Sequence, residues 1–192
     1  MNVNISGSNV QIMWKEIAII LIILYLIRCL TDLYIIKGYK KILNSFFADE
    51  WRGLEQKIEK YQKLCNIFSN GPFNKKIRFI YNTLCVVLAS IKYIDGNEPE
   101  FLYHLKRIKK ENEFEMKSFV LALYFHSKGR MSEAEESYHY FLKCNSENQE
   151  AKDILVYLFH PDQRKDLEVA CVKAKQAFRN PAIIELFKVN HI

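Results

Sequence analysis

The chain has 192 residues, of which 28 are basic and 22 acidic, and its formal net charge is +6. Up to Ala48 there are 5 basic and 2 acidic residues, and after it 23 and 20, so half of the excess lies in the first quarter of the chain. The remainder is only mildly basic, which argues against a polybasic nucleic-acid-binding surface.

The polar residues show no pattern typical of catalysis or of metal binding. No phosphate-binding glycine loop or nucleophile motif occurs, and no histidine lies at a metal-ligand spacing. We therefore expect no enzyme, cofactor or metal site. The cysteines are odd in number and widely spaced, which is typical of reduced thiols that pack as small apolar side chains; they are Cys29, Cys65, Cys85, Cys144 and Cys171.

An uncharged run from Ile17 to Ile27 is the most apolar part of the chain. Alone it is shorter than the about 20 residues that a membrane-spanning helix needs. Extended to Trp14 and Tyr34 it reaches that length, with an aromatic residue near each end, as interfacial anchoring favours. We predict one transmembrane helix over residues 14–36, with lipid contacts through Ile17–Tyr34.

Two other interpretations of this run are a buried core helix and a cleaved signal peptide. A core helix would keep a polar face, which the run lacks. A signal peptide would have small residues at a cleavage site, and none follows the run. Arg28 and Asp32 stand four residues apart, so they share one helix face and we expect them to pair within the span.

The charges around the span predict its orientation. Lys37, Lys40 and Lys41 follow it, whereas Lys15 stands alone before it, beside Glu16. The positive-inside rule then places the short polar tail outside and the rest of the chain in the cytoplasm. The polar tail comprises residues 1–13. We expect a single-pass protein of a bacterial cell membrane with a cytoplasmic C-terminal domain.

Residues 37–72 are predicted to form a juxtamembrane linker and an amphipathic helix. Apolar residues recur there at alternating steps of four and three, as along a heptad seam. The seam serves either packing against the following helices or a homodimer formed through its first five residues. It comprises Phe47, Trp51, Leu54, Ile58, Tyr61, Cys65 and Phe68.

Two further helices are predicted before residue 112. Residues 75–94 are mostly apolar but are interrupted by polar residues, which favours a central buried helix over a second span. Residues 98–111 form an amphipathic pattern with Pro99 in the first turn. Its basic face is either simply solvated or attracted to anionic headgroups, and carries Lys106, Arg107, Lys109 and Lys110.

Residues 121–142 predict a helical hairpin. Gly129 suits a left-handed C-cap, and Ser132 with Glu135 suits a capping box for the second helix. The segment resembles a tetratricopeptide repeat, although it lacks the early tryptophan and has Phe141 at a usually small position. The matching positions are Ala122, Phe125, Gly129, Ala134 and Tyr138.

The spacing of the turn residues supports an array of such hairpins. Turns near Gly96, Gly129 and Pro161 recur at about 33 residues, close to the period of this family. Turns between hairpins are expected near Gly71, Asn112, Asn145 and Asn180. The predicted fold is all-α: a transmembrane helix, then a tetratricopeptide-like α-solenoid of antiparallel hairpins over 73–180, and a capping segment over 181–192.

The resemblance implies a partner-binding concave face lined by the first helix of each hairpin. In the best-matching hairpin this face is largely apolar, which predicts an apolar or helical protein segment as the ligand. Coverage by a neighbouring helix of the same chain is the alternative. The expected partner-binding residues are Met116, Phe119, Val120, Leu123 and His126.

These features predict a membrane-anchored adaptor or assembly factor that holds a protein partner at the membrane. One alternative is a small subunit of a membrane complex for secretion, export or immunity, recognised through its span and the Arg28–Asp32 pair. A second alternative is a membrane-linked regulator that contacts nucleic acid, although the charge balance disfavours it.

Overall fold

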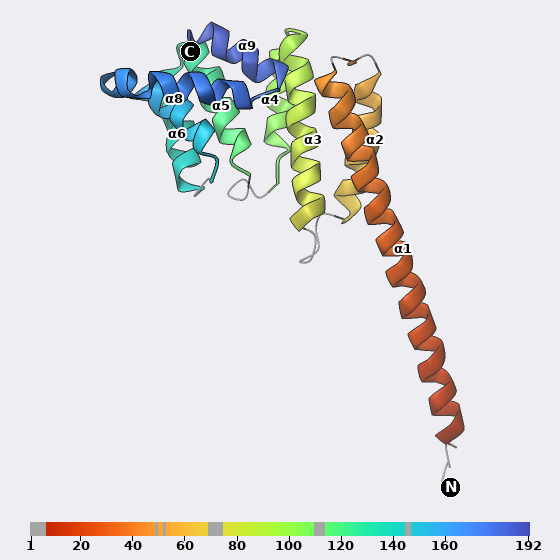
Figure 1. Ribbon diagram of the computed structural model, residues 1–192. Coiled ribbons are helices and arrows are strands. Elements are labelled where there is room, and N and C mark those ends of the chain that lie inside the picture. The colour runs from red at the N-terminus through yellow and green to blue at the C-terminus, as the bar shows by residue number, and fades with distance from the viewer. Residues whose placement is uncertain (1–6, 49, 52, 69–74, 110–113, 145–146) are drawn as a thin grey trace.

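The computed structural model describes the chain except residues 1–6, 49, 52, 69–74, 110–113 and 145–146, and the side chains of 7–13 and 15. The described residues form nine α-helices and one 3-10 turn, with no strand, which confirms the all-α class (Figure 1). The elements are α1 (Gly7–Phe47), α2 (Leu54–Phe68), α3 (Lys75–Ile94), α4 (Glu98–Lys106), α5 (Met116–Ser127), α6 (Met131–Lys143), α7 (Gln149–Phe159), η2 (Pro161–Gln163), α8 (Arg164–Ala177) and α9 (Pro181–Val189).

Helix α1 projects from the other helices over its N-terminal half (Figure 1). The part from Glu16 to Phe47 is long and apolar enough to cross a membrane, and only 6% of its most apolar stretch is buried within the chain. Large apolar side chains are exposed from Ile17 to Tyr34. Partial burial begins at Arg28, which lies over the Phe68 ring of α2, and full burial begins at Ile35. The projecting half therefore offers an apolar surface that no other described part of the chain covers.

The helix does not end where the span was predicted to end. Residues 37–47 continue α1 without a break, so the expected linker is wrong for this segment. The cause is a second packing face: Ile35, Ile42 and Phe46 are almost fully buried and lie on one side of the helix. The C-terminal half of α1 is thereby built into the domain against α2 and α3.

The predicted heptad seam is divided between two helices. Its first residue, Phe47, ends α1, Trp51 lies in the turn, and the remainder belongs to α2. Leu54 and Ile58 are buried within this chain, with exposed fractions of 2% and 0%. The seam therefore serves packing against neighbouring helices, and these two residues are not available to a second copy.

Helix α3 is the centre of the domain. It passes the same length and composition test for a membrane span as α1, but 72% of its most apolar stretch is buried within the chain. The expectation of a central buried helix is confirmed. It contacts α1, α2, α4 and α9, and its buried residues include Leu84, Cys85, Leu88 and Ala89.

Three helical hairpins follow each other in the chain: α3–α4, α5–α6 and α7–α8. Their turns lie where they were predicted, and Gly129 has a positive φ of 68°. The capping box is wrong, because α6 begins one residue before Ser132 and its N-cap is Arg130, whose guanidinium pairs with Glu133. Three predicted turns between hairpins, near Gly71, Asn112 and Asn145, lie outside the described residues.

Helix α4 is shorter than the predicted 98–111. Asn97 caps its start by accepting a hydrogen bond from the Glu100 backbone N–H, and Pro99 lies in the first turn as expected. The helix ends at Lys106, so the remaining basic residues lie after it rather than on its face. Of those, Lys110 is outside the described residues.

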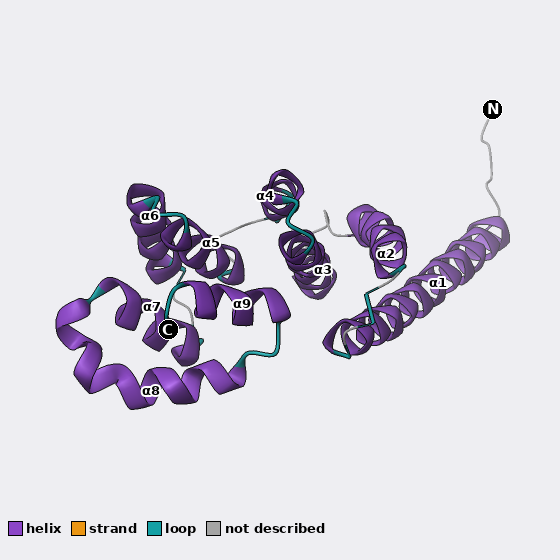
Figure 2. Ribbon diagram, turned by 90° about the horizontal axis from the view of Figure 1, so that it is seen from above, coloured by secondary structure: helices purple, strands orange, loops and turns teal. Residues whose placement is uncertain are grey.

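Helix α9 does not simply cap the end of an open stack. It folds back to pack against α3 and α5, and Figure 2 shows it enclosed between them and α8. Ala182, Ile183, Leu186 and Phe187 are buried in this packing. Repeats in an open solenoid contact only their neighbours, so this return departs from the predicted arrangement.

Candidate functional site

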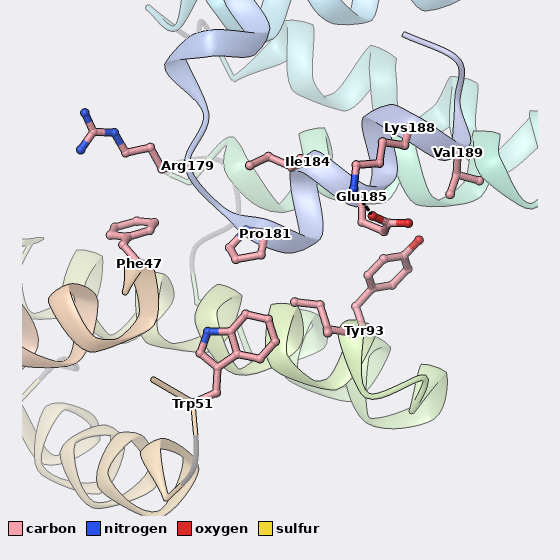
Figure 3. Close-up of a pocket in the computed structure, with 10 residues that line it drawn as sticks. Phe47, Trp51, Tyr93, Arg179, Pro181, Ile184, Glu185, Lys188 and Val189 are labelled. Carbon is pink, nitrogen blue, oxygen red and sulfur yellow. Dashed lines mark hydrogen bonds and ion pairs between the residues drawn. The ribbon is translucent and has the colours of Figure 1, made fainter. Parts of the chain in front are cut away.

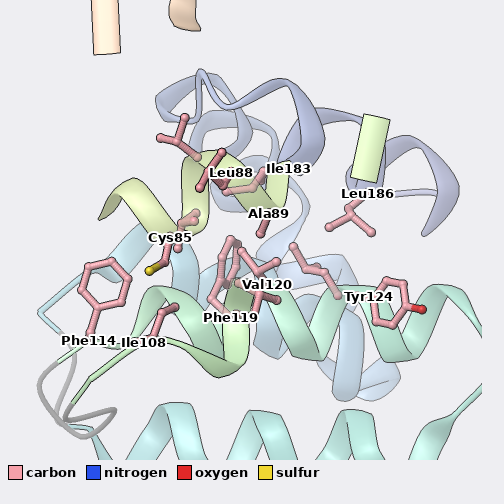
Figure 4. Packing of buried hydrophobic residues seen from close by; sticks show 14 of the residues in the cluster. Cys85, Leu88, Ala89, Ile108, Phe114, Phe119, Val120, Tyr124, Ile183 and Leu186 are labelled. Carbon is pink, nitrogen blue, oxygen red and sulfur yellow. The ribbon is translucent and has the colours of Figure 1, made fainter. Parts of the chain in front are cut away.

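The face expected to bind a partner is covered by the chain's own α9. Phe119, Val120 and Leu123 have exposed fractions of only 0–3%, while Met116 and His126 are half-buried. Figure 4 shows Phe119 and Val120 among the buried residues that also include Leu186 of α9. Of the two predictions for this face, the one that agrees with the structure is that a helix of the same chain covers it.

Hydrogen bonds fix both ends of α9. At its start, the Asn180 side chain caps Ala182 N–H and donates to the Ser90 hydroxyl of α3 at 2.9 Å. At its end, Asn190 donates to the Leu123 carbonyl at 3.0 Å and lies 2.7 Å from His126 Nδ1. His126 is thus a structural partner of α9.

The outward side of α9 forms a groove with the end of α3 and the turn between α1 and α2. This α9 groove has a volume of about 620 Å³, within the range usual for ligand-binding clefts. Figure 3 shows Phe47, Trp51 and Tyr93 facing the α9 residues across it. Four lining side chains are substantially exposed large apolar groups: Phe47, Ile94, Ile184 and Val189.

Trp51 is held rigidly at one wall of the α9 groove. Its indole N–H donates to the Phe46 carbonyl at 3.1 Å, and its ring stacks on the Phe46 ring with centroids 6.3 Å apart. Phe46 is itself fully buried. An aromatic side chain fixed in this way offers contact area with little loss of conformational entropy on binding.

Tyr93 is held in place by an aromatic cluster. Its ring centroid lies 5.4 Å from that of Phe101 and 6.4 Å from that of Tyr124. Burial raises the pKa of Tyr93, so its hydroxyl is a neutral hydrogen-bonding group at physiological pH. The Tyr124 hydroxyl donates to Glu98, which joins this cluster to the start of α4.

Charges lie at the rim of the α9 groove. Glu185 and Lys188 pair with each other at 3.0 Å, whereas Arg179 extends away from the other lining residues in Figure 3. A second cavity of about 420 Å³ adjoins the groove at Trp51, and its lining includes Glu55 and Asp95. Trp51 thus lies between the rim that carries Arg179 and a region in which Glu55 pairs with Lys92 at 2.7 Å.

Arg28 and Asp32, which were predicted to pair within the span, do contact each other. Arg28 Nε lies 3.2 Å from Asp32 Oδ1, and the Arg28 guanidinium lies over the Phe68 ring, 4.8 Å from its centroid. Both side chains remain about one-third exposed. Arg28 therefore already has two partners within the chain.

The basic residues near α4 do not form a free row. Lys109 lies over the Tyr81 ring at 4.9 Å, and Arg107 lies over the Tyr103 ring at 5.7 Å. The Lys109 backbone also exchanges two hydrogen bonds with the Asn82 side chain. Burial lowers the pKa of Lys109.

The acidic, histidine and cysteine side chains of the described residues are not gathered into a cluster. Within them, no group of three or more His, Cys, Asp or Glu side chains is placed to hold a metal ion. Burial raises the pKa of Cys65 to about 12 and that of Cys85 to about 11, so neither thiol is activated. The α9 groove can bind an apolar group and orient it by the charges at its rim.

Most of the α9 groove was missed by sequence reasoning. Phe47 and Trp51 were identified, but as part of the heptad seam, and the α9 residues were assigned to a cap. One signal was present: α9 carries apolar residues on more sides than one packing face requires. Ile184 and Val189 are the surplus, and both are exposed.

Comparisons with known proteins leave this site without a precedent. No protein-family model matches the sequence, and no curated protein or solved structure matches it significantly. The tetratricopeptide resemblance of residues 121–142 therefore stays a prediction.

Proposed function

We propose that this protein is a membrane-anchored adaptor with tetratricopeptide-like hairpins, which holds a protein partner at the cytoplasmic face of a bacterial cell membrane. The observation that carries the proposal is the α9 groove. It gathers exposed apolar side chains from α1, α3 and α9 at a rigid aromatic wall, beyond the residues 14–36 that are predicted to cross the membrane. Exposed apolar clusters of this kind mark interaction sites.

The hairpin geometry supports the family part of the proposal. Ala122 of α5 and Ala134 of α6 are both fully buried, and these two helices contact each other extensively. Small residues at these positions allow close approach of the helices, as in the repeat that the sequence resembles.

The occupant that fits the α9 groove is a segment of another protein. An apolar or aromatic side chain would lie between Trp51 and Ile184, and a nearby carboxylate would reach Arg179 at the rim. Anchoring by α1 would confine such a partner to a thin layer at the membrane, which raises its effective concentration.

A photo-crosslinking experiment tests the proposal. A photoreactive amino acid is placed at Ile184 of the full chain in membranes, and the matched control carries it at Val169 of α8, which is 81% exposed. We expect a specific crosslinked protein from position 184 only, and its yield should fall at least about ten-fold in W51A, as for an interface anchor. Equal yields from both positions, or no effect of W51A, would contradict the proposal.

The span-recognised subunit is the second candidate. Its support is that Arg28 and Asp32 keep about a third of their side chains exposed on an otherwise apolar helix. Replacing both by leucine should leave the Ile184 crosslink intact if the adaptor proposal holds, and should abolish it if the span is the recognition element. A crosslink to a second copy of this chain would instead favour a homodimer.

A further inference from the structure

A second cavity lies between α1 and α2, on the side of the domain nearest the projecting apolar half of α1. This α1–α2 cleft has a volume of about 220 Å³. Its lining includes Tyr34, Lys41 and Ser45 of α1 and Lys57, Lys60 and Tyr61 of α2.

The cleft has one closed, aromatic end. Tyr34 and Tyr61 stack there, with ring centroids 5.5 Å apart and an interplanar angle of 21°. The absence of a side chain at Gly38 makes this possible, because the Tyr61 ring occupies the space that a Cβ there would need. The two helices therefore approach closely at the tyrosines.

The cleft is strongly cationic. Lys41, Lys57 and Lys60 all line it and are exposed, and no acidic residue contributes to its lining. Within the described part of the chain, none of the three makes an ion pair. Three like charges around one small cavity repel each other, so a bound anion is stabilised by all of them.

The position of the cleft along α1 indicates the source from which an anion could reach it. The apolar surface of α1 stays exposed on one face up to Tyr34, while the end of α2 covers the other face from Arg28, which lies over Phe68. Tyr34 is also the first cleft residue along the helix. Lys41 lies two helical turns further, about 10 Å along the axis. If α1 crosses a bilayer, the headgroup layer lies where α2 joins α1, and the tyrosine end of the cleft is its end nearest to that layer, where tyrosine side chains are preferred.

We propose that the α1–α2 cleft binds the phosphate of an anionic phospholipid, with the acyl chains lying against the exposed apolar face of α1. The lysines neutralise the phosphate, while the Ser45 and Tyr61 hydroxyls can donate to it. The cleft floor includes Ile42 and Leu54, which are apolar and buried and suit the glycerol backbone. This inference rests on the proposed membrane anchoring.

Native mass spectrometry of the full chain in detergent tests the site. The probe is an equimolar mixture of phosphatidylglycerol and phosphatidylcholine, and the measured quantity is the ratio of the two bound lipids. A lysine near an anionic surface contributes about a five-fold factor in affinity. We therefore expect the triple variant K41Q/K57Q/K60Q to lower the phosphatidylglycerol preference at least about ten-fold, and the triple Lys→Arg variant to retain it.

The matched control carries the same loss of charge elsewhere. Lys143, Lys165 and Lys173 are exposed residues of α6 and α8. Their triple Lys→Gln variant should keep the wild-type lipid ratio. An equal loss in this control would mean that net charge alone attracts the lipid, and would overturn the site, as would a triple cleft variant with wild-type preference.

Two further experiments distinguish a lipid phosphate from a soluble phosphate, and a failure of the cleft from a failure of the membrane anchor. Displacement of the lipid by millimolar inorganic phosphate would identify a soluble phosphate as the ligand and overturn the lipid proposal. Extraction of the chain from vesicles by alkaline carbonate measures the anchor alone. A chain that resists extraction but shows no lipid preference refutes only the cleft, whereas an extractable chain refutes the anchoring on which the cleft depends.

Discussion

Replacing Phe119 by alanine tests how firmly α9 is bound over the hairpins. Phe119 is fully buried, and its ring stacks on Phe178 at 5.1 Å and meets Phe187 of α9 edge-on at 6.4 Å. A buried Phe→Ala substitution costs about 3–5 kcal/mol. Each aromatic pair adds about 0.5–1.5 kcal/mol beyond buried area. We therefore expect F119A to lower the free energy of unfolding by about 4 kcal/mol.

This loss is large relative to the stability of a domain, which is about 5–15 kcal/mol. At about 2–4 °C per kcal/mol for a chain of this size, the melting temperature should fall by about 10 °C. The assay is thermal and urea unfolding of the full chain in detergent, followed by far-UV circular dichroism. V169A is the surface control, and its expected change is within about 0.5 kcal/mol.

A double-mutant cycle with F187A isolates the contact between α5 and α9. The two losses should be non-additive, with a coupling of about 1 kcal/mol, because the rings touch. Additive losses, or a loss for F119A no greater than that for V169A, would refute the account of α9 as a firmly packed cover of this face.

Three other outcomes follow from the structure. G129A should cost about 1 kcal/mol in thermal unfolding, because φ is 68° there, while G129N should cost less. Burial lowers the pKa of His104, so the folded state disfavours imidazolium; melting temperature should fall as pH drops below about 6.5, and H104L should remove that dependence. At pH 8, iodoacetamide should label Cys144, which is half-buried, well before the fully buried Cys65 and Cys85, as mass spectrometry of the modified peptides would show.

Local signals in the sequence predicted the hairpins correctly. Gly129 marks a turn because glycine adopts a left-handed backbone conformation more readily than other residues. Pro161 marks a turn because proline cannot continue a preceding helix. The apolar run from Ile17 was long enough to identify the projecting half of α1, and the mixed pattern of residues 75–94 identified the central helix. These features depend on residues that are close together in the chain, so they can be recognised from the sequence alone.

Long-range packing was not predictable in the same way. The break after Phe47 was hidden because the apolar steps of four and three continue through the turn into α2. The return of α9 over α5 depends on contacts such as Asn190 with His126, which are 64 residues apart. The expected binding face was therefore chosen on the covered side, and the α9 groove appeared only once α9 had been placed.

Helix α1 runs without a break from its projecting half into the domain, so it connects the two parts rigidly. From Tyr34 to Phe47 there is no hinge, so the domain keeps a fixed height of about 20 Å and a fixed azimuth relative to the projecting half. Each residue of an α-helix turns the chain by about 100°, so one residue inserted near Tyr34 would rotate the α9 groove by that angle about the axis of the projecting half. If α1 anchors the protein in a membrane as proposed, the choice of partner would depend on this rotation as much as on the chemistry of the groove.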